Sequence, residues 1–308
     1  MQSALDPKGE NAAGIAEITW ILFGGGTLIF IAVMVLALVA LSGTGRQRAA
    51  LGRQALIVGA GIAFPVVVLS ALLVYTFASA AAMVGARGQP AARIEVVGEL
   101  WWWRIRYLDD SGKPMLETAN EIRIPAGSPV ELILMTSDVI HSFWVPNLAG
   151  KLDMLPGTVN RLRITANEVG VFRGQCAEYC GMQHANMALQ VVVSEPNEYR
   201  SWLEANLLPA QEPGSPQLQH GRQLFLDNRC GLCHTIRGTS AAGTHGPDLT
   251  HVGSRLSLAA GTLPNNPGSI AGWIAGGQHL KPGNKMPSFA QFSGEDLRAL
   301  AAYLESLQ

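Results

Sequence analysis

The sequence has few charged residues and only four cysteines. Lys, Arg, Asp and Glu make up 15% of the 308 residues, and the formal net charge is −1. A nucleic-acid-binding protein would show an excess of basic residues, so no nucleic-acid partner is expected. The cysteines form two pairs, Cys176/Cys180 and Cys230/Cys233, each followed closely by a histidine. This pattern favours cofactor ligation over a disulfide framework.

Charge is absent altogether from two stretches near the N-terminus, residues 18–45 and 54–86. The apolar part of the first, residues 18–41, is long enough to cross a bilayer core of about 30 Å. Glycines and Pro65 within these stretches would weaken a soluble helix, whereas membrane helices tolerate them when packed against neighbours. We therefore predict a transmembrane hairpin of two α-helices, within residues 1–90, in contact with membrane lipid. A buried soluble hairpin is the alternative.

The orientation of this hairpin follows from its few basic residues. The connector, residues 43–53, contains three arginines, against a single Lys8 in the N-terminal segment. The positive-inside rule then puts the connector in the cytoplasm and the rest of the chain on the outer side. Residues 1–17 lack the basic region and cleavage site of a signal peptide, so none is expected. This pattern predicts a two-pass protein of a bacterial inner (plasma) membrane, with its remaining domains on the periplasmic side.

Beyond residue 90 the pattern changes to short alternating runs separated by Gly- and Pro-containing turns. Apolar side chains alternate, for example, at Val130, Leu132 and Leu134. Such runs are typical of a β-sandwich or barrel. The predicted strands are 92–99, 101–108, 121–124, 129–135, 159–165, 170–175 and 188–194. With a helix predicted at 196–207, they form a domain assigned to residues 91–207.

The densest group of potential metal ligands is C-A-E-Y-C-G-M-Q-H-A-N-M, which begins at residue 176. With one upstream histidine, the candidates are His141, Cys176, Glu178, Cys180, His184 and Met187. Sulfur and imidazole suit copper or zinc better than magnesium or calcium. Two thiolates, two imidazoles and a thioether exceed the four ligands of zinc and fit two copper ions bridged by both cysteines. The thioether and the Glu178 carbonyl would be weak outer ligands. A disulfide and a Cys2His2 zinc site are the alternatives.

A second cofactor site is predicted nearer the C-terminus. Residues 208–216 are rich in proline and are expected to be a flexible linker to a domain at 217–308. In this domain Cys230-Gly-Leu-Cys233-His234 is a c-type haem attachment signal. The two thiols would bond the haem vinyl groups, and His234 would bind the iron. A redox dithiol is the alternative.

An electron-carrying haem also needs a sixth ligand, and methionine in that position raises the potential. Met286 is the one methionine that follows Met187 in the sequence. The rival ligands are His245, His251 and His279. Apolar residues recur at helical spacing in 294–307, which predicts a terminal helix packed beside the haem.

These motifs carry resemblances to known families. C-x-E-x-C-x3-H-x2-M with an upstream histidine resembles the dinuclear copper (CuA) loop of cytochrome c oxidase subunit II, with every ligand position filled. From His220 to the end, including Gly246-Pro247-Asp248-Leu249, the chain resembles a class I cytochrome c. The whole order resembles subunit II of a cytochrome c oxidase with a fused cytochrome c domain. The expected fold is therefore a membrane-anchored multidomain chain with two transmembrane α-helices, an all-β cupredoxin-like sandwich and an all-α cytochrome c domain.

The resemblance also implies the function. Electrons from a cytochrome c or another upstream donor would be accepted at the tethered haem, pass to the copper pair, and go on to subunit I, which reduces oxygen and translocates protons. Subunit III would be a further partner. In Trp101-Trp102-Trp103, the pattern alone favours a strand or a membrane-surface belt. The resemblance instead makes Trp101 the point where electrons enter the copper domain. It also implies that the Glu178 side chain binds a magnesium ion at the subunit I interface.

One departure from the family pattern concerns protons. An acidic residue commonly lies seven positions before the proline of the second helix, at the mouth of a proton channel, and here that position is Val58. Three other functions remain compatible with the residues. They are a subunit of a copper-containing nitric-oxide reductase, an anchored electron carrier without a catalytic partner, and a copper-delivery protein.

Overall fold

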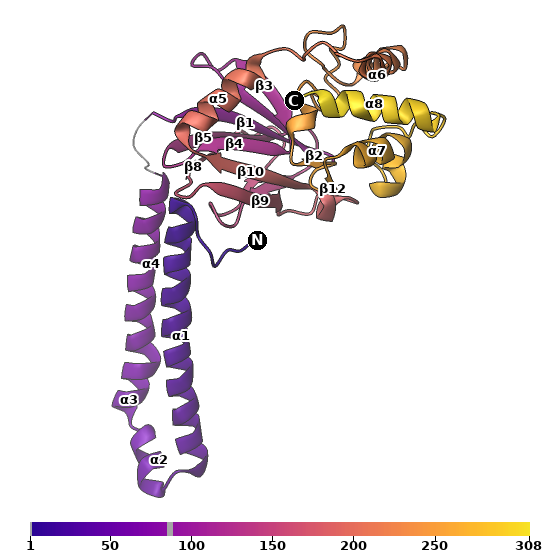
Figure 1. The fold of residues 1–308 in the computed structure, drawn as a ribbon. Coiled ribbons are helices and arrows are strands. Elements are labelled where there is room, and N and C mark those ends of the chain that lie inside the picture. The colour runs from indigo at the N-terminus through magenta and orange to yellow at the C-terminus, as the bar shows by residue number, and fades with distance from the viewer. Residues whose placement is uncertain (1, 85–88) are drawn as a thin grey trace. The chain divides into compact units, whose positions relative to one another are not determined.

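The computed structural model describes residues 2–84 and 89–308. The described chain divides into two compact units. One is helical and extends from Asn11 to Val84, and the other combines residues 2–10 with 89–308. Figure 1 labels their elements along the chain.

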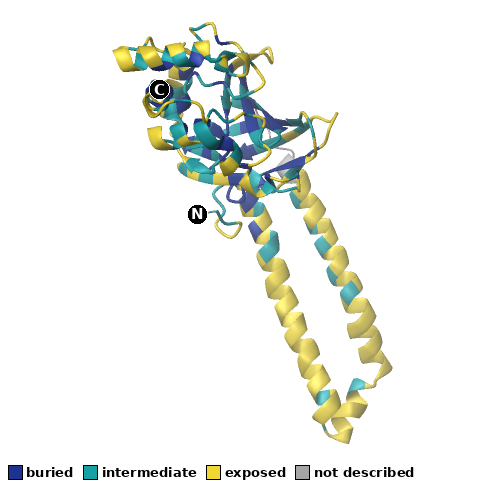
Figure 2. Ribbon diagram, turned by 90° about the vertical axis from the view of Figure 1, so that its right-hand side faces the viewer, coloured by how far each residue is buried: buried dark blue, intermediate teal, exposed yellow. Residues whose placement is uncertain are grey.

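The helical unit contains two long apolar segments. Its elements are α1 (Glu10–Ser42), α2 (Gly45–Leu51), α3 (Gln54–Val58), the π-helix η1 (Gly59–Ala63) and α4 (Phe64–Val84). The segments Glu10–Ser42 and Gln54–Ala81 each have a mean hydropathy of 2.6, and their most apolar windows are not buried. Figure 2 shows both segments almost entirely exposed. Apolar side chains exposed over such lengths need lipid around them, so the two helices form a membrane anchor.

Local sequence explains the details of this unit. Pro65 has no N–H to donate within a helix, and the preceding turn is a π-helix in which Phe64 N donates to Gly59 O. The connector contains a helix that the sequence analysis did not predict. Thr44 begins α2 with a capping box, in which its side chain accepts from Gln47 N. The two long helices are joined by a 2.8 Å hydrogen bond from Tyr75 Oη to Glu17 Oε1. The predicted second stretch ends at residue 86, and its last two residues lie outside the described part of the chain.

Residues 92–194 form the predicted sandwich, cupredoxin-like, from two five-stranded sheets with the orders β3-β2-β1-β5-β8 and β4-β10-β9-β6-β7. The strands are β1 (Ala92–Glu99), β2 (Trp102–Leu108), β3 (Pro114–Ala119), β4 (Glu121–Pro125), β5 (Pro129–Thr136), β6 (His141–Trp144), β7 (Leu152–Met154), β8 (Asn160–Thr165), β9 (Gly170–Cys176) and β10 (Ala188–Ser194). Alternate side chains of both sheets face inward and form one core that includes Trp103, Leu132 and Phe143. Cys176, Cys180 and Met187 lie at the edge of this same core.

The C-terminal part is mainly helical and has a core of its own. It follows α5 (Pro196–Leu207), which packs on the sandwich core through Tyr199 and Trp202. Its elements are α6 (Pro216–Asp227), the 3-10 turns η3 (Cys230–Leu232) and η4 (Val252–Ser254), the short strands β11 (Ser257–Leu258) and β12 (Leu263–Pro264), α7 (Pro267–Leu280) and α8 (Gly294–Ser306). Phe225 of α6, Ile274 of α7 and Leu300 of α8 are buried together. Figure 1 shows these three helices gathered on one side of the sandwich.

The segment between α5 and α6 is not a free tether. Ala210 N donates to Arg237 O at 2.9 Å, and Arg237 Nη1 donates to Leu207 O at 2.9 Å. Glu212 forms an ion pair of 2.6 Å with Arg222. The expectation of a flexible linker at 208–216 is therefore corrected, because hydrogen bonds to the helical domain hold this segment in place.

Candidate copper and haem sites

Five of the six predicted metal ligands have their donor atoms around one point at the edge of the sandwich core. Cys176 Sγ lies 3.7 Å from His141 Nδ1 and 3.2 Å from the carbonyl oxygen of Glu178. Cys180 Sγ lies 3.6 Å from His184 Nδ1 and 3.9 Å from Met187 Sδ. Each thiol thus faces its own imidazole. The sixth, Glu178, faces the cluster through its backbone carbonyl, which is the donor predicted for it.

The sheet fixes these ligands. His141 begins β6 and Cys176 ends β9, and the two strands are paired through Phe143 and Cys176. Cys180, His184 and Met187 come from the following loop and from η2 (His184–Asn186), which ends at Met187. Backbone hydrogen bonds from Cys176 N to Met187 O and from Ala177 N to Ser142 O close the loop on the strands. A loop anchored in this way at both ends can hold metal geometry.

The hydrogen bond between the two thiols shifts their pKa values in opposite directions. The hydrogen bond from Cys180, together with the one from His141, lowers the pKa of Cys176 to about 3 against the effect of burial. The same hydrogen bond and burial raise the pKa of Cys180 well above its ordinary value. All four cysteines of the chain are free. The pair therefore presents one thiolate, the form of cysteine that binds metal, with a second thiol beside it.

Two neighbours that the sequence analysis missed fix His141. Asp138 accepts from His141 Nε2 at 2.9 Å, which orients Nδ1 toward Cys176. On balance its hydrogen bonds to Asp138 and Cys176 raise the pKa of His141, although burial lowers it. Gly98 of β1 faces the ring, and a Cβ there would lie 2.7 Å from His141 Cδ2. Only the three-residue spacing of Asp138 and His141 was visible in the sequence as a signal.

The side chain of Glu178 is half exposed and is not among the clustered side-chain donors His141, Cys176 and Cys180. Its carboxylate lies 3.4 Å from Lys151 Nζ. It shares that lysine with Asp153, also at 3.4 Å. The side chain is therefore separate from the sulfur cluster.

The three consecutive tryptophans have three different environments. Trp101 Nε1 donates to the carbonyl oxygen of Cys180 at 2.9 Å. Trp102 lies under the guanidinium of Arg104, which is 4.8 Å from the ring centroid. Trp103 is fully buried in the sandwich core. Of the three, Trp101 is the one hydrogen-bonded to the loop at residues 177–187, called the cysteine loop below.

The geometry around His234 suits an iron ligand. His234 Nδ1 lies 2.8 Å from Pro247 O. A carbonyl oxygen can only accept, so Nδ1 carries the proton and Nε2 keeps its lone pair. Burial lowers the pKa of His234, which favours the neutral ring. A Cβ on Gly246 would lie 2.6 Å from the imidazole, so a glycine is needed for this packing. Cys230 begins η3, and Cys233 follows its last residue and directly precedes His234.

Met286 lies in a loop that is held to α7. Its N–H donates to Asn284 Oδ1 at 2.8 Å, and its carbonyl accepts from Gln278 Nε2 at 2.7 Å. The side chain is partly buried against the core of the helical domain. Both ring nitrogens of His251 lie within hydrogen-bond distance of carbonyl oxygens, those of Gln308 and Leu208. His245 and His279, the other rival ligands, are exposed.

The same loop reaches the cysteine loop of the sandwich. A Cβ on Gly283 would lie 3.5 Å from Trp101 and from Met182 Sδ, so Gly283 lies against both. Gln183 Nε2 donates to Pro282 O at 2.8 Å, and Ala188 N donates to Ala260 O at 3.0 Å. The Trp101 ring is thus placed between the cysteine loop and the loop that carries Met286.

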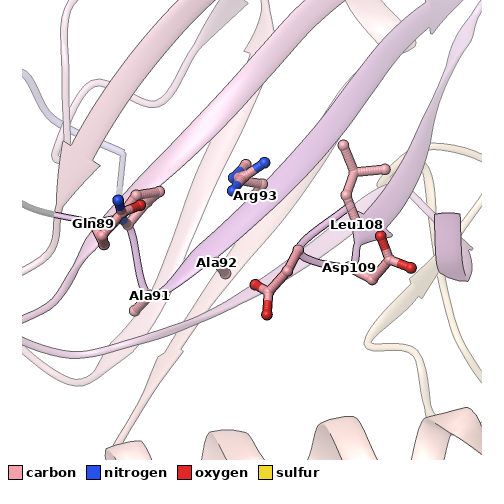
Figure 3. Close-up of a pocket in the computed structure, with 8 residues that line it drawn as sticks. Gln89, Ala91, Ala92, Arg93, Leu108 and Asp109 are labelled. Carbon is pink, nitrogen blue, oxygen red and sulfur yellow. The ribbon is translucent and has the colours of Figure 1, made fainter. Parts of the chain in front are cut away.

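A cavity of about 390 Å³ lies elsewhere, where β1 begins and β2 ends (Figure 3). Its lining consists of Gln89, Pro90, Ala91, Ala92, Arg93, Leu108, Asp109 and Asp110. None of these residues belongs to the two ligand groups. The cavity is therefore no part of the candidate sites.

Comparison with known proteins agrees with this geometry. Residues 106–194 match the family profile of the cytochrome c oxidase subunit II periplasmic domain, and residues 218–308 match that of cytochrome c. Cytochrome c oxidase subunit 2 of Alkalihalophilus pseudofirmus is 40% identical over 221 residues, which are 72% of this chain and 63% of that protein. The Bacillus subtilis protein of the same name is 30% identical over 73% of this chain and 64% of its own length. The chain thus spans just under two thirds of the length of these relatives.

Among solved structures, the periplasmic domain of subunit II of cytochrome oxidase from Bradyrhizobium japonicum is similar to part of this chain. It is 30% identical, covers 39% of this chain and 95% of its own, and gives a TM-score of 0.36. The two matched families together account for both the sandwich and the helical domain. The chain belongs to the cytochrome c oxidase subunit II family and carries a cytochrome c domain at its C-terminal end.

Proposed function

We propose that this chain is the electron-transfer subunit of a respiratory cytochrome c oxidase. It would accept electrons one at a time at a haem c on the helical domain and deliver them to a dinuclear copper centre in the sandwich. Subunit I, the oxygen-reducing and proton-translocating subunit, would receive them next. The observation that carries this proposal is the position of Trp101, which is hydrogen-bonded to Cys180 O and packed against the Met286 loop.

The donor set fits a copper pair. Two Cys–His pairs lie side by side, His141 with Cys176 and His184 with Cys180. One tetrahedral zinc would use four of these donors and leave Met187 Sδ and the Glu178 carbonyl without a role. When bound, the copper pair would supply a one-electron redox centre. His141, Cys176, Cys180 and His184 would hold it, with the thioether and the carbonyl as weak outer ligands.

The residues of the helical domain fit a haem c. Cys230 and Cys233 would form the thioether bonds, and Nε2 of His234 would bind the iron from one side. Met286 would bind from the other side, because its loop is fixed on α7 while the rival histidines are exposed or engaged with carbonyls. Methionine ligation would keep the potential of the haem high, as an electron carrier near the end of a respiratory chain needs.

The placement in the membrane and the partners complete the proposal. The arginine-containing connector would lie in the cytoplasm of a bacterial cell, and the copper and haem domains would lie in the periplasm. Subunits I and III, and an upstream donor such as a cytochrome c, would be the partners. The Glu178 carboxylate, which lies 3.4 Å from Lys151 Nζ, would bind magnesium at the subunit I interface. Val58 stands in the second helix where the family commonly has an acidic residue at the mouth of a proton channel.

Metal analysis of the purified full chain tests the copper assignment. We expect two copper ions and one haem per chain, and a mixed-valence copper signal. Cys176→Ser should abolish the strong thiolate-to-copper absorption and leave the haem bands unchanged. One zinc ion, or a disulfide without metal, would contradict the proposal. Identification of the haem and metal of the partner purified with the chain tests the assignment to an oxygen-reducing complex.

A further inference from the structure

Lys281 is buried between the sandwich and the helical domain. It follows α7 directly and is 3% exposed. The helical domain contains two lysines, and the other, Lys285, is exposed. None of the ion pairs among the described residues includes Lys281. A buried ammonium without a carboxylate is costly unless hydrogen bonds satisfy it, so its surroundings need an explanation.

Three carbonyl oxygens satisfy it. Lys281 Nζ donates to Trp101 O at 2.7 Å and to Asn186 O at 2.8 Å, both in the sandwich. It also donates to Ala259 O at 3.0 Å, in its own domain. The three acceptors match the three N–H bonds of an ammonium group. Two of these acceptors belong to the segments proposed for electron transfer. They are Trp101 itself and Asn186, which precedes Met187 in the cysteine loop.

We propose that Lys281 is the positioning residue that fixes the haem domain on the copper domain, with Trp101 between them. This inference rests on the proposed function and adds to it the side chain that keeps the haem domain and the copper domain in one relative position. Other polar contacts cross the same boundary, such as Arg104 Nη2 to Thr244 O at 2.7 Å and Leu256 N to Glu121 Oε2 at 2.9 Å. Those involve Arg104 of β2 and Glu121 of β4, whereas Lys281 binds the backbone of Trp101 itself.

The cost of burial is what makes this contact specific. Lys281 Nζ is shielded from water, so the three carbonyls replace the solvent that would otherwise hydrogen-bond to it. Burial lowers the pKa of Lys281 to about 7, which is the direction expected for an ammonium group removed from water. A shift of the haem domain along the sandwich would leave a buried ammonium and two carbonyls unpaired, which is strongly unfavourable. One arrangement of the Met286 loop over Trp101 is thereby favoured over its neighbours.

Hydrogen exchange on the full chain tests this without depending on activity. Lys281→Met removes the three bonds, and Lys285→Met makes the same change of charge on an exposed position of the same loop. In Lys281→Met we expect the amides of Ala188 and Leu256, which bond across the boundary, to exchange about tenfold faster or more. Amides within β10 and α8 should keep their protection. In Lys281→Gln, which retains a hydrogen-bond donor, the exchange rates of these two amides should lie between those of Lys281→Met and the wild type.

Electron transfer gives the second readout. The step moves one electron from the reduced haem to the copper pair and makes or breaks no bond. In Lys281→Met the intramolecular rate should fall at unchanged potentials. The second-order reduction of copper by added reduced cytochrome c should rise, because Trp101 becomes accessible. A general loss of structure would instead expose both cores and would raise exchange everywhere.

Two results would overturn the inference. One is wild-type exchange at Ala188 and Leu256 in Lys281→Met, and the other is an equal effect of Lys285→Met. The proposed function fails separately, if the wild-type chain itself shows no transfer from haem to copper.

Discussion

Several candidate functional residues of this chain are held by hydrogen bonds that backbone carbonyls accept, as well as by contacts between side chains. Trp101 binds the carbonyl of Cys180 through its indole and offers its own carbonyl to Lys281. His234 owes its tautomer to the carbonyl of Pro247. The sequence predicts candidate ligands because cysteine, histidine and methionine at fixed spacing are chemically distinctive. It gives no sign of Lys281 or Gly98, because a backbone acceptor or a close ring contact leaves no pattern in sequence.

Met286 is testable at this scale. Met286→Ala should lower the haem potential and open the sixth position to carbon monoxide, because methionine ligation raises the potential. The covalent haem should remain, since both attachment cysteines are untouched. Met115→Ala, an exposed methionine on β3, is the matched control and should change neither property. Unchanged redox and optical behaviour in Met286→Ala would show that one of the three rival histidines is the ligand.

At the scale of elements, the position of the His141 ring on β6 depends on how closely β1 packs against it. Gly98→Ala in β1 puts a Cβ 2.7 Å from the His141 ring. Forcing an extra carbon into a packed site costs about 1–3 kcal/mol. We expect weaker copper binding and an altered copper spectrum, with normal haem bands. Gly214→Ala, where a Cβ meets nothing, is the control. Copper binding equal to wild type in Gly98→Ala would show that the position of the His141 ring does not depend on a glycine at residue 98.

Elements with a clear pattern in the sequence could be predicted, and elements that depend on tertiary contacts could not. The predicted bounds of β1, β10 and α5 are those of the structure, because each is a run with clear periodicity or a helix that begins at a proline. The strands β6 and β7 have four and three residues, and tertiary pairing defines them rather than any local pattern. The helix α7 was also missed, since its glycines at 268, 272, 276 and 277 argue against a helix until the haem domain packs around it.

At the scale of the whole molecule, the order of anchor, sandwich and cytochrome domain follows from the sequence, but the contact between the last two does not. Residues 208–216 were expected to be flexible, which would bring the haem near the copper only on average. The structure instead holds this segment by hydrogen bonds and places the Met286 loop against Trp101. Contacts between domains join residues far apart in the chain, as Lys281 and Trp101 are, and no local signal encodes them. The predicted domain bounds remain predictions.

The central claim is that electrons pass from the haem to the copper within one chain, through Trp101. The most direct test is flash reduction of the haem in the full chain, followed by the appearance of reduced copper. We predict a rate that does not depend on protein concentration. The rate should fall sharply in Trp101→Ala, with both cofactors bound at nearly unchanged potentials. It should stay near the wild-type value in Trp102→Ala, because that ring packs against Arg104 instead. A rate that rises in proportion to protein concentration, or a normal rate in Trp101→Ala, would contradict the account.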